Sequence, residues 1–113
     1  MRVWSLLLLA TVMITGCGRV PDGQVELIAD IATDGQRLIV KNGDAFVWQD
    51  AEVVINGEYV YRAELLPRGA SALPFSAFIT EYGHRVLDSD ASLRSVEIRV
   101  PDARDGVPGR YKW

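Results

Sequence analysis

The chain has 113 residues, of which 12 are Lys or Arg, 15 are Asp or Glu, one is His and one is Cys. That length accommodates one small domain and excludes a large multidomain enzyme. A net charge of -3 at pH 7 disfavours a nucleic-acid binder, which normally presents a basic face. A single Cys excludes an intramolecular disulfide and any metal site built from several cysteines.

The N-terminal segment has the pattern of a secretory signal. Arg2 supplies one positive charge before an uncharged, largely apolar run at residues 3–14, and Gly16 and Cys17 follow. A membrane-spanning helix needs about 20 apolar residues. The run at 3–14 is shorter, which is typical of the apolar core of a cleaved signal peptide.

The end of this run, Ile14-Thr15-Gly16-Cys17, resembles the lipobox, the signal motif of bacterial lipoproteins. An aliphatic residue stands three positions before the Cys, although Leu is more usual there than Ile14. The resemblance implies that residues 1–16 are removed as a signal peptide. It also implies that Cys17 carries a diacylglyceryl thioether and an N-acyl chain such as palmitate, which would anchor the chain to a membrane. An ordinary signal peptide or a short anchor helix with an unmodified thiol is the alternative.

The residue after Cys17 bears on the destination. In lipoprotein sorting, an Asp at this position favours retention in the inner membrane, and this chain has Gly18 instead. We therefore expect a lipid-anchored protein of the bacterial cell envelope, at the outer membrane and facing the periplasm if the source is Gram-negative. Residues 17–23 would form the acylated Cys and a short polar tether, and residues 24–113 would form one domain.

Residues 24–113 alternate between apolar and polar side chains with the period of β-strands rather than of helices. The alternation predicts strands at 24–31, 37–41, 45–48, 52–65, 71–75, 93–100 and 110–113. Asp34-Gly35 favours a hairpin in which both residues have positive φ. Asn56-Gly57 is either a second hairpin turn or a bulge within a longer strand.

Three further features complete the expected strand pattern. We expect Pro101 to end the strand at 93–100, residues 105–109 to form a turn, and residues 78–82 to form a single helical turn. About seven short strands separated by turns predict an all-β fold, a single small antiparallel sandwich of the immunoglobulin or fibronectin type. A partly closed barrel is the alternative. Aromatic side chains should dominate the core: Phe46, Trp48, Tyr59, Tyr61, Phe75 and Phe78.

A second resemblance covers most of the domain, from about residue 38 to residue 100. The stretch 38–48, with its Asn-rich turn and Phe-x-Trp, is similar to a segment of small bacterial β-sandwich domains of unknown function. The segments that follow agree with it: Ile55-Asn56-Gly57-Glu58-Tyr59, Leu66-Pro67-Arg68-Gly69, Phe78 and Gly83-His84-Arg85. These are core and turn residues, so the resemblance implies a fold and transfers no catalytic residue.

Two local patterns support alternative functions. His84, the only histidine, could combine with Asp88 and Asp90 in a loop-built site of a small enzyme or inhibitor. The Asp-x-Asp spacing at 88–90 also occurs in calcium loops, which would suit a calcium-dependent adhesion module. Turn residues explain both patterns more simply. We therefore predict no catalytic residue, no resident metal and no cofactor.

The remaining candidate site is at the C-terminus, where Arg110, Tyr111 and Trp113 predict a contact surface. The sequence thus favours a non-catalytic binding or assembly module of the cell envelope. Its expected partners are a membrane, through lipidated Cys17, and an envelope protein or peptide, with no nucleic acid.

Overall fold

A computed structural model of the chain describes residues 23–80, 83, 85–87 and 92–113. The described residues contain nine β-strands and one short 3-10 helix. The strands are β1 (Val25–Glu26), β2 (Ala29–Thr33), β3 (Arg37–Asn42), β4 (Trp48–Ile55), β5 (Tyr59–Leu66), β6 (Gly69–Pro74), β7 (Ile79–Thr80), β8 (Val96–Arg104) and β9 (Val107–Lys112), and the helix is η2 (Phe75–Ala77). Cys17 and the rest of the predicted signal segment lie outside the described residues.

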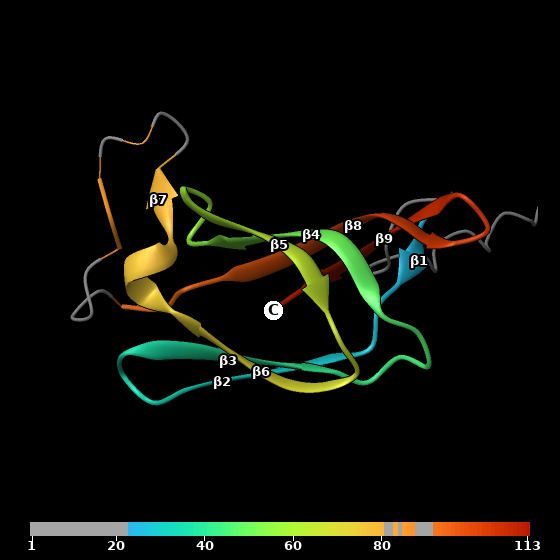
Figure 1. Ribbon diagram of the computed structural model, residues 1–113. Coiled ribbons are helices and arrows are strands. Elements are labelled where there is room, and N and C mark those ends of the chain that lie inside the picture. The colour runs from blue at the N-terminus through green and yellow to red at the C-terminus, as the bar shows by residue number, and fades with distance from the viewer. Residues whose placement is uncertain (1–22, 81–82, 84, 88–91) are drawn as a thin grey trace, which may run out of the picture.

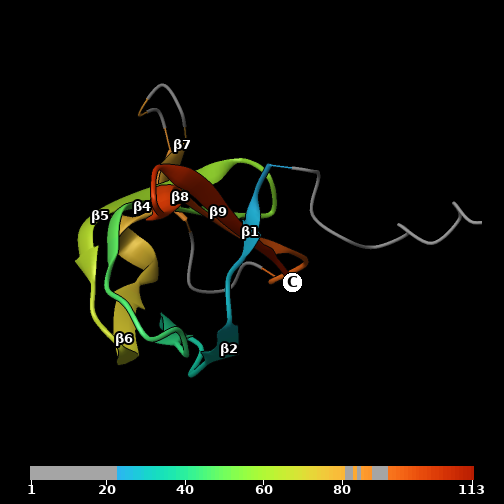
Figure 2. The ribbon, with the colours of Figure 1, turned by 90° about the vertical axis from the view of Figure 1, so that its right-hand side faces the viewer.

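The strands form two sheets that face each other (Figure 1). The larger sheet has the order β1-β9-β8-β4-β5-β7, and the smaller has the order β2-β3-β6. Within each sheet, neighbouring strands pair in antiparallel fashion, except that β1 and β9 are parallel. Figure 2 shows the chain passing from β1 in the larger sheet to β2 in the smaller one. The predicted all-β sandwich is confirmed. The described residues form seven longer strands and, in addition, the two-residue strands β1 and β7.

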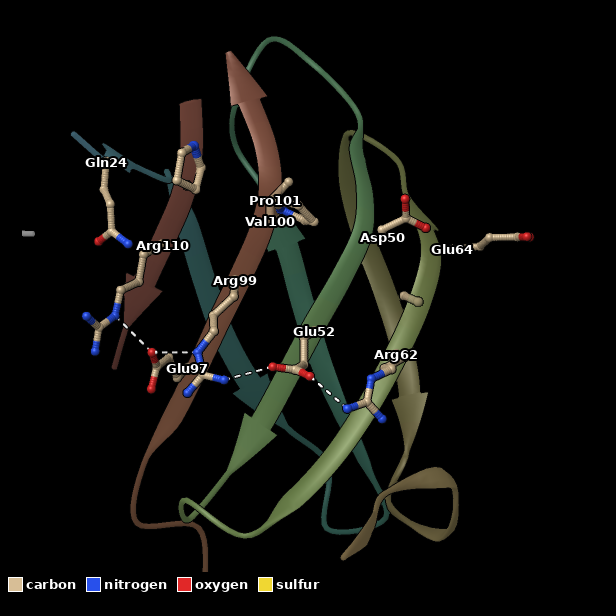
Figure 3. Close-up of a pocket in the computed structure, with 13 residues that line it drawn as sticks. Gln24, Asp50, Glu52, Arg62, Glu64, Glu97, Arg99, Val100, Pro101 and Arg110 are labelled. Carbon is tan, nitrogen blue, oxygen red and sulfur yellow. Dashed lines mark hydrogen bonds and ion pairs between the residues drawn. The ribbon is translucent and has the colours of Figure 1, made fainter. Parts of the chain in front are cut away.

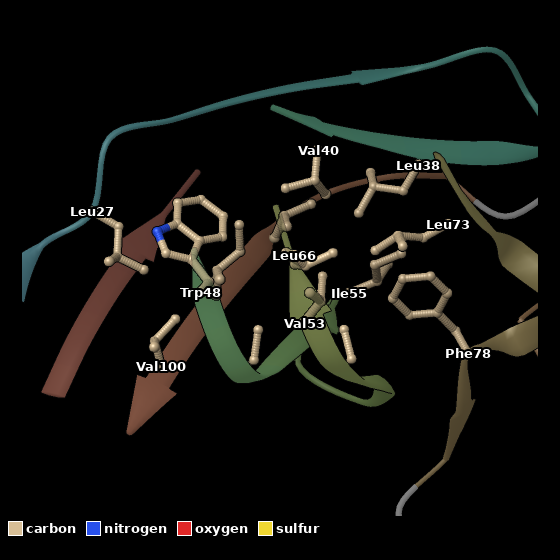
Figure 4. Packing of buried hydrophobic residues seen from close by; sticks show 14 of the residues in the cluster. Leu27, Leu38, Val40, Trp48, Val53, Ile55, Leu66, Leu73, Phe78 and Val100 are labelled. Carbon is tan, nitrogen blue, oxygen red and sulfur yellow. The ribbon is translucent and has the colours of Figure 1, made fainter. Parts of the chain in front are cut away.

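The hydrophobic core fills the space between the two sheets (Figure 4). Inward-facing residues of both sheets meet there, including Leu38, Val53, Ile98 and the large side chains of Trp48 and Phe78. Of the six aromatic residues predicted to dominate the core, Trp48, Phe75 and Phe78 are buried. The other three pack against the core and are only partly buried: Phe46, Tyr59 and Tyr61.

A small polar cluster is buried beside this core. Trp48 Nε1 donates to Asp44 Oδ2 at 3.0 Å, and the Ile28 backbone N–H donates to the same oxygen at 3.2 Å. Asn42 accepts from the Asp44 backbone N–H at 2.9 Å and donates to the Leu66 carbonyl at 3.1 Å. Buried polar groups need such partners to avoid a desolvation penalty. The cluster therefore ties β3, β4, β5 and the β1–β2 connection together.

The hairpin between β2 and β3 is confirmed, but its turn differs from the prediction. Only Gly35 has a positive φ, of 91°. Asp34 instead turns the backbone with its carboxylate, because Oδ1 accepts from the N–H groups of Gln36 at 3.0 Å and Arg37 at 2.8 Å. Its Oδ2 lies 2.6 Å from Arg37 Nη2. This is the Asx-turn geometry for which Asp is favoured in turns.

These contacts make stability depend on pH. The backbone N–H of Gln36 and then the guanidinium of Arg37 lower the pKa of Asp34 from 3.8 to about 2. Because the folded pKa lies below the unfolded one, the carboxylate stabilises the fold above the unfolded pKa and loses that effect as the pH falls towards 2. In Asp34→Asn the amide oxygen can still accept both N–H bonds, but the charge is gone.

We therefore expect the urea midpoints of wild type and Asp34→Asn to differ most near neutral pH and to converge at about pH 2. Urea titrations from about pH 6 down to about pH 2 would measure this difference. A difference that stays constant over the whole range would contradict the assigned role of the Asp34 charge.

The other two hairpin turns differ in length. Asn56 and Gly57 have φ values of 55° and 73° and turn the chain between β4 and β5, with the Glu58 N–H donating to the Ile55 carbonyl at 3.1 Å. Because Ile55 pairs with Tyr59, this connection has three residues, and it is a hairpin turn rather than a bulge within a longer strand. Asp105 and Gly106, at 51° and 81°, form a two-residue turn between β8 and β9. The predicted turn at 105–109 is therefore too long, because β9 begins directly after Gly106.

The prediction that Pro101 ends its strand is wrong. β8 continues through it to Arg104, with a register shift against β9 between Val100 and Arg104. β4 pairs with β8 only as far as Glu52 opposite Arg99, so Pro101 lies beyond that ladder. A proline is tolerated at a bulge or edge where its missing N–H is not needed.

The helical turn also lies earlier than predicted. It occupies η2, with Pro74 before it at φ -66° and the Phe78 N–H donating to the Phe75 carbonyl at 3.0 Å. Phe78 itself is extended and leads directly into β7. With the turn at 75–77, both Phe75 and Phe78 are buried, as predicted for the core.

Candidate binding groove

The outer face of the larger sheet, opposite the core, carries a groove of about 770 Å³. It opens where β4 and β8 diverge, because their pairing stops at Glu52 and Arg99 (Figure 3). Asp50 and Pro101 border the groove beyond this point, and Pro108 borders it on β9. The local split in the sheet therefore creates a hollow on what would otherwise be a continuous strand surface.

A row of alternating charges crosses the groove (Figure 3). Arg110 Nε and Arg99 Nε lie 2.8 and 3.0 Å from Glu97 Oε2. Arg99 Nη1 lies 2.8 Å from Glu52 Oε1, and Arg62 Nη2 lies 3.0 Å from Glu52 Oε2. Glu52 is the cross-strand neighbour of both Arg62 and Arg99, so strand register creates the row. We call these residues of β9, β8, β4 and β5 the charged row.

The contacts of the charged row shift the pKa values of two of its members, Glu97 and Arg99. Burial by itself raises the pKa of Glu97, but the hydrogen bond from Arg99 and the charges of Arg99, Arg110 and Lys112 outweigh it, so the pKa is lowered. The pKa of Arg99 is raised, first by its hydrogen bond to Glu97. The side chains of Glu97 and Glu52 are only 18% and 26% exposed, whereas those of Arg99 and Arg62 are 52% and 73% exposed. The solvent-exposed surface of the charged row is therefore formed mainly by arginine side chains.

The wall of the groove beside β9 contains two polar atoms without a hydrogen-bond partner in the described part of the chain. They are Gln24 Oε1 and Arg110 Nε, and both are buried. The 2.8 Å contact of Arg110 Nε with Glu97 is thus an ion pair whose N–H is not aligned with the carboxylate. A buried polar atom left without a partner costs about 1–3 kcal/mol. Both atoms are shielded from solvent, so a ligand in the groove could reach them only if a neighbouring side chain moved.

The structure places two residues of the predicted C-terminal contact surface, Arg110 and Tyr111, on opposite faces of β9. Arg110 lies on the outer face, in the groove, whereas Tyr111 points the other way and packs against the core. Burial, followed by the charge of Asp30, raises the pKa of Tyr111. Trp113 is 49% exposed, and its backbone N–H donates to the Val96 carbonyl at 2.8 Å. Arg110 and Tyr111 therefore do not share one face, and contact through Trp113 stays a prediction.

Four other predicted candidates are not tested by the structure. Cys17, His84, Asp88 and Asp90 lie outside the described residues. Asp102 accepts from the Gly106 N–H at 2.8 Å and so stabilises the β8–β9 turn. Within the described ranges, no three His, Cys, Asp or Glu side chains are placed to hold a metal ion. No helix in those ranges has the length and apolar character needed to cross a membrane.

The sequence contains one local signal for the charged row. Arg62, Arg99 and Arg110 alternate with less polar residues in segments predicted to be strands, as outward-facing residues do. Their pairing needs the order β9-β8-β4-β5, which no local pattern encodes. The outward positions of the predicted strands could have identified the members, but not which of them are neighbours.

Comparisons with known proteins provide no relative for this chain. No protein-family model matches it, and no curated protein or solved structure matches it. The resemblances to the lipobox and to small bacterial sandwich domains therefore stay predictions made from the residues alone.

Proposed function

We propose that this chain is a lipid-anchored, non-catalytic binding module of the bacterial cell envelope. Cys17 would attach it to a membrane, and the groove would hold a segment of a partner protein. The observation that carries the binding role is the charged row, which lines a groove on the solvent face of the sandwich. The leader pattern at residues 1–17 supports the location.

The chemistry of the groove suits an extended polypeptide as the partner. Three arginines and four acids line it, so a polyanion such as a nucleic acid would meet carboxylates as well as guanidiniums. A peptide backbone offers both N–H donors and carbonyl acceptors to the charged side chains that line the groove. Its side chains can supply charges of both signs along the row, which favours specificity.

The electrostatics of the row favour binding over acid–base catalysis. Glu97 contacts two guanidiniums, those of Arg99 and Arg110, and Glu52 contacts those of Arg62 and Arg99. A catalytic acid needs a pKa near the working pH, which usually requires a raised carboxyl pKa. The pKa of Glu97 is shifted in the opposite direction. Glu97 is therefore suited to orienting arginines rather than to transferring protons.

A site-specific photocrosslink in intact cells would test the groove. The crosslinker would replace Pro108 at the groove wall, and a matched control would carry it at exposed Lys41 on β3, in the other sheet. We expect one discrete protein adduct from position 108 only. Arg99→Glu should reduce that adduct about tenfold or more, because it reverses a charge that a partner in the groove contacts.

Two outcomes would contradict the proposal. One is the same set of adducts from positions 108 and 41, and the other is a position-108 adduct that Arg99→Glu leaves unchanged. A urea midpoint for each variant would show that the fold is retained and that any loss of adduct reflects the groove.

A further inference from the structure

We infer that two copies of this chain pair through the free edge of β5 and so extend the larger sheet across a two-fold axis. β7 pairs with β5 only at Tyr59 and Val60. Among the described residues, no strand covers that side of β5 from 61 to 66. Figure 2 shows β5 at the outer margin of the sheet. An open edge of this kind presents unpaired backbone groups to another strand.

The charged row ends at this edge with an incomplete alternation. Its last member, Arg62, lies on β5, and a strand added beside β5 would place one residue directly opposite it. An acid at that place would continue the order of guanidinium and carboxylate. Glu64, two residues along β5, is exposed and has no ion pair in the described part of the chain. Figure 3 shows its side chain extending away from β4.

A second copy supplies the missing acid by symmetry. In an antiparallel pair centred on Ala63, Arg62 of each copy lies opposite Glu64 of the other. This pairing uses residues 61–65 of both copies, all within the stretch that β7 leaves free. The same contact made twice is the hallmark of a two-fold interface. The two charged rows would then form one continuous row across both sheets.

Neighbouring registers are less favourable. Centring the pair on Arg62 or on Glu64 places like charges directly opposite each other, which is destabilising. A slip by one residue would turn the core-facing side of one strand towards solvent. The charges at Arg62 and Glu64 thus select the register centred on Ala63.

The two edges of the smaller sheet, β2 and β6, lack this complementarity. A two-fold pair centred on Ile31 of β2 would place Asp30 opposite Ala32, which provides no charge pair. β6 contains no charged residue and ends in Pro74, so a pair through this edge would also lack ion pairs. The opposite edge of the larger sheet is β1, which has only two residues. The observations therefore single out β5.

Charge reversal with two differently tagged full-length copies would test the pairing. Arg62→Glu leaves carboxylates at both positions, and Glu64→Arg leaves guanidiniums at both. Detergent-solubilised wild-type copies should be recovered together. Each variant paired with itself should be recovered about tenfold less well, because both cross-copy ion pairs become repulsive. Co-production of the two variants should restore recovery, because each then faces the opposite charge.

Two control variants separate this interface from other effects. Asp30→Arg, on the β2 edge, and Arg99→Glu, in the groove, should both leave self-pairing unchanged. The inference does not depend on the groove partner. If tagged wild-type copies are recovered together but the crosslinker at position 108 captures no partner protein, only the proposed function is contradicted.

Cysteine crosslinking would provide a second measurement. A mixture of Arg62→Cys and Glu64→Cys copies should form a disulfide between copies, because directly opposite residues on paired strands lie within disulfide distance. The wild type, which has only Cys17, gives the background. Self-pairing of the reversed variants at wild-type level, or a mixture of reversed variants that stays unpaired, would overturn the inference.

Discussion

Replacing Trp48 with Ala should lower the free energy of unfolding by about 3–5 kcal/mol, as is typical for removing a large core aromatic side chain. Trp48 is fully buried between the sheets, and its Nε1 donates to Asp44. The change would leave a cavity and remove a partner from a buried carboxylate. Small domains have about 5–15 kcal/mol of stability in total, so we expect a largely unfolded or easily unfolded chain.

Trp48→Phe is the matched control for this prediction. It keeps most of the ring volume but loses the N–H, so it isolates the hydrogen bond to Asp44 and should cost about 1–3 kcal/mol. Urea denaturation followed by circular dichroism would measure both variants. A Trp48→Ala variant within about 1 kcal/mol of the wild type would contradict the assigned core, because cavity formation there should cost several times more.

Replacing Cys17 with Ser should have an all-or-none effect on processing. If Cys17 is the acylated residue, the variant has no thiol to receive the diacylglyceryl group. We therefore expect incorporation of an alkyne-labelled palmitate to disappear and residues 1–16 to remain attached. Metabolic labelling followed by electrophoresis would show both effects. Ser5→Ala, within the apolar run, is a control that should leave labelling and processing unchanged.

A Cys17→Ser chain that is still labelled and still shortened would contradict the lipobox interpretation. A wild-type chain that is shortened without incorporating label would support an ordinary signal peptide instead. The distinction matters physically, because each buried CH₂ of an acyl chain contributes about 0.8 kcal/mol to membrane attachment.

The strands of the fold could be predicted because their information is local. Val96, Ile98 and Val100 alternate with polar residues and all face the core, as their period-2 spacing requires. The wrong predictions concern positions where contacts with distant parts of the chain decide the local structure. Pro101 is tolerated within β8 only because β4 has already diverged, and no feature of the sequence near Pro101 reports that divergence.

The groove and the β5 edge were not predictable for a related reason. Glu52 meets Arg62 through a hairpin, a local contact that the Asn56-Gly57 turn sets. Its contact with Arg99, 47 residues away, depends on β8 being the other neighbour of β4. Opposite-charge pairs on exposed strand faces are common, and only the sheet order turns these into a continuous row.

Arg62 links the two proposed surfaces. It lines the groove through its contact with Glu52, and it would face Glu64 of a second copy across the β5 edge. Two paired copies would present their grooves on one continuous sheet, so a partner segment could contact both. Arg99 tests the groove alone. Glu64 borders the groove but forms no ion pair in the described part of the chain, so Glu64→Arg disturbs the charged row less than Arg62→Glu does.

The mass of the N-terminal peptide of the mature chain, released from purified membranes, tests the central claim most directly. A lipid-anchored module predicts a peptide that begins at Cys17 and carries diacylglyceryl and N-acyl groups. A peptide that begins at Met1, or a Cys17 with an unmodified thiol, would contradict it.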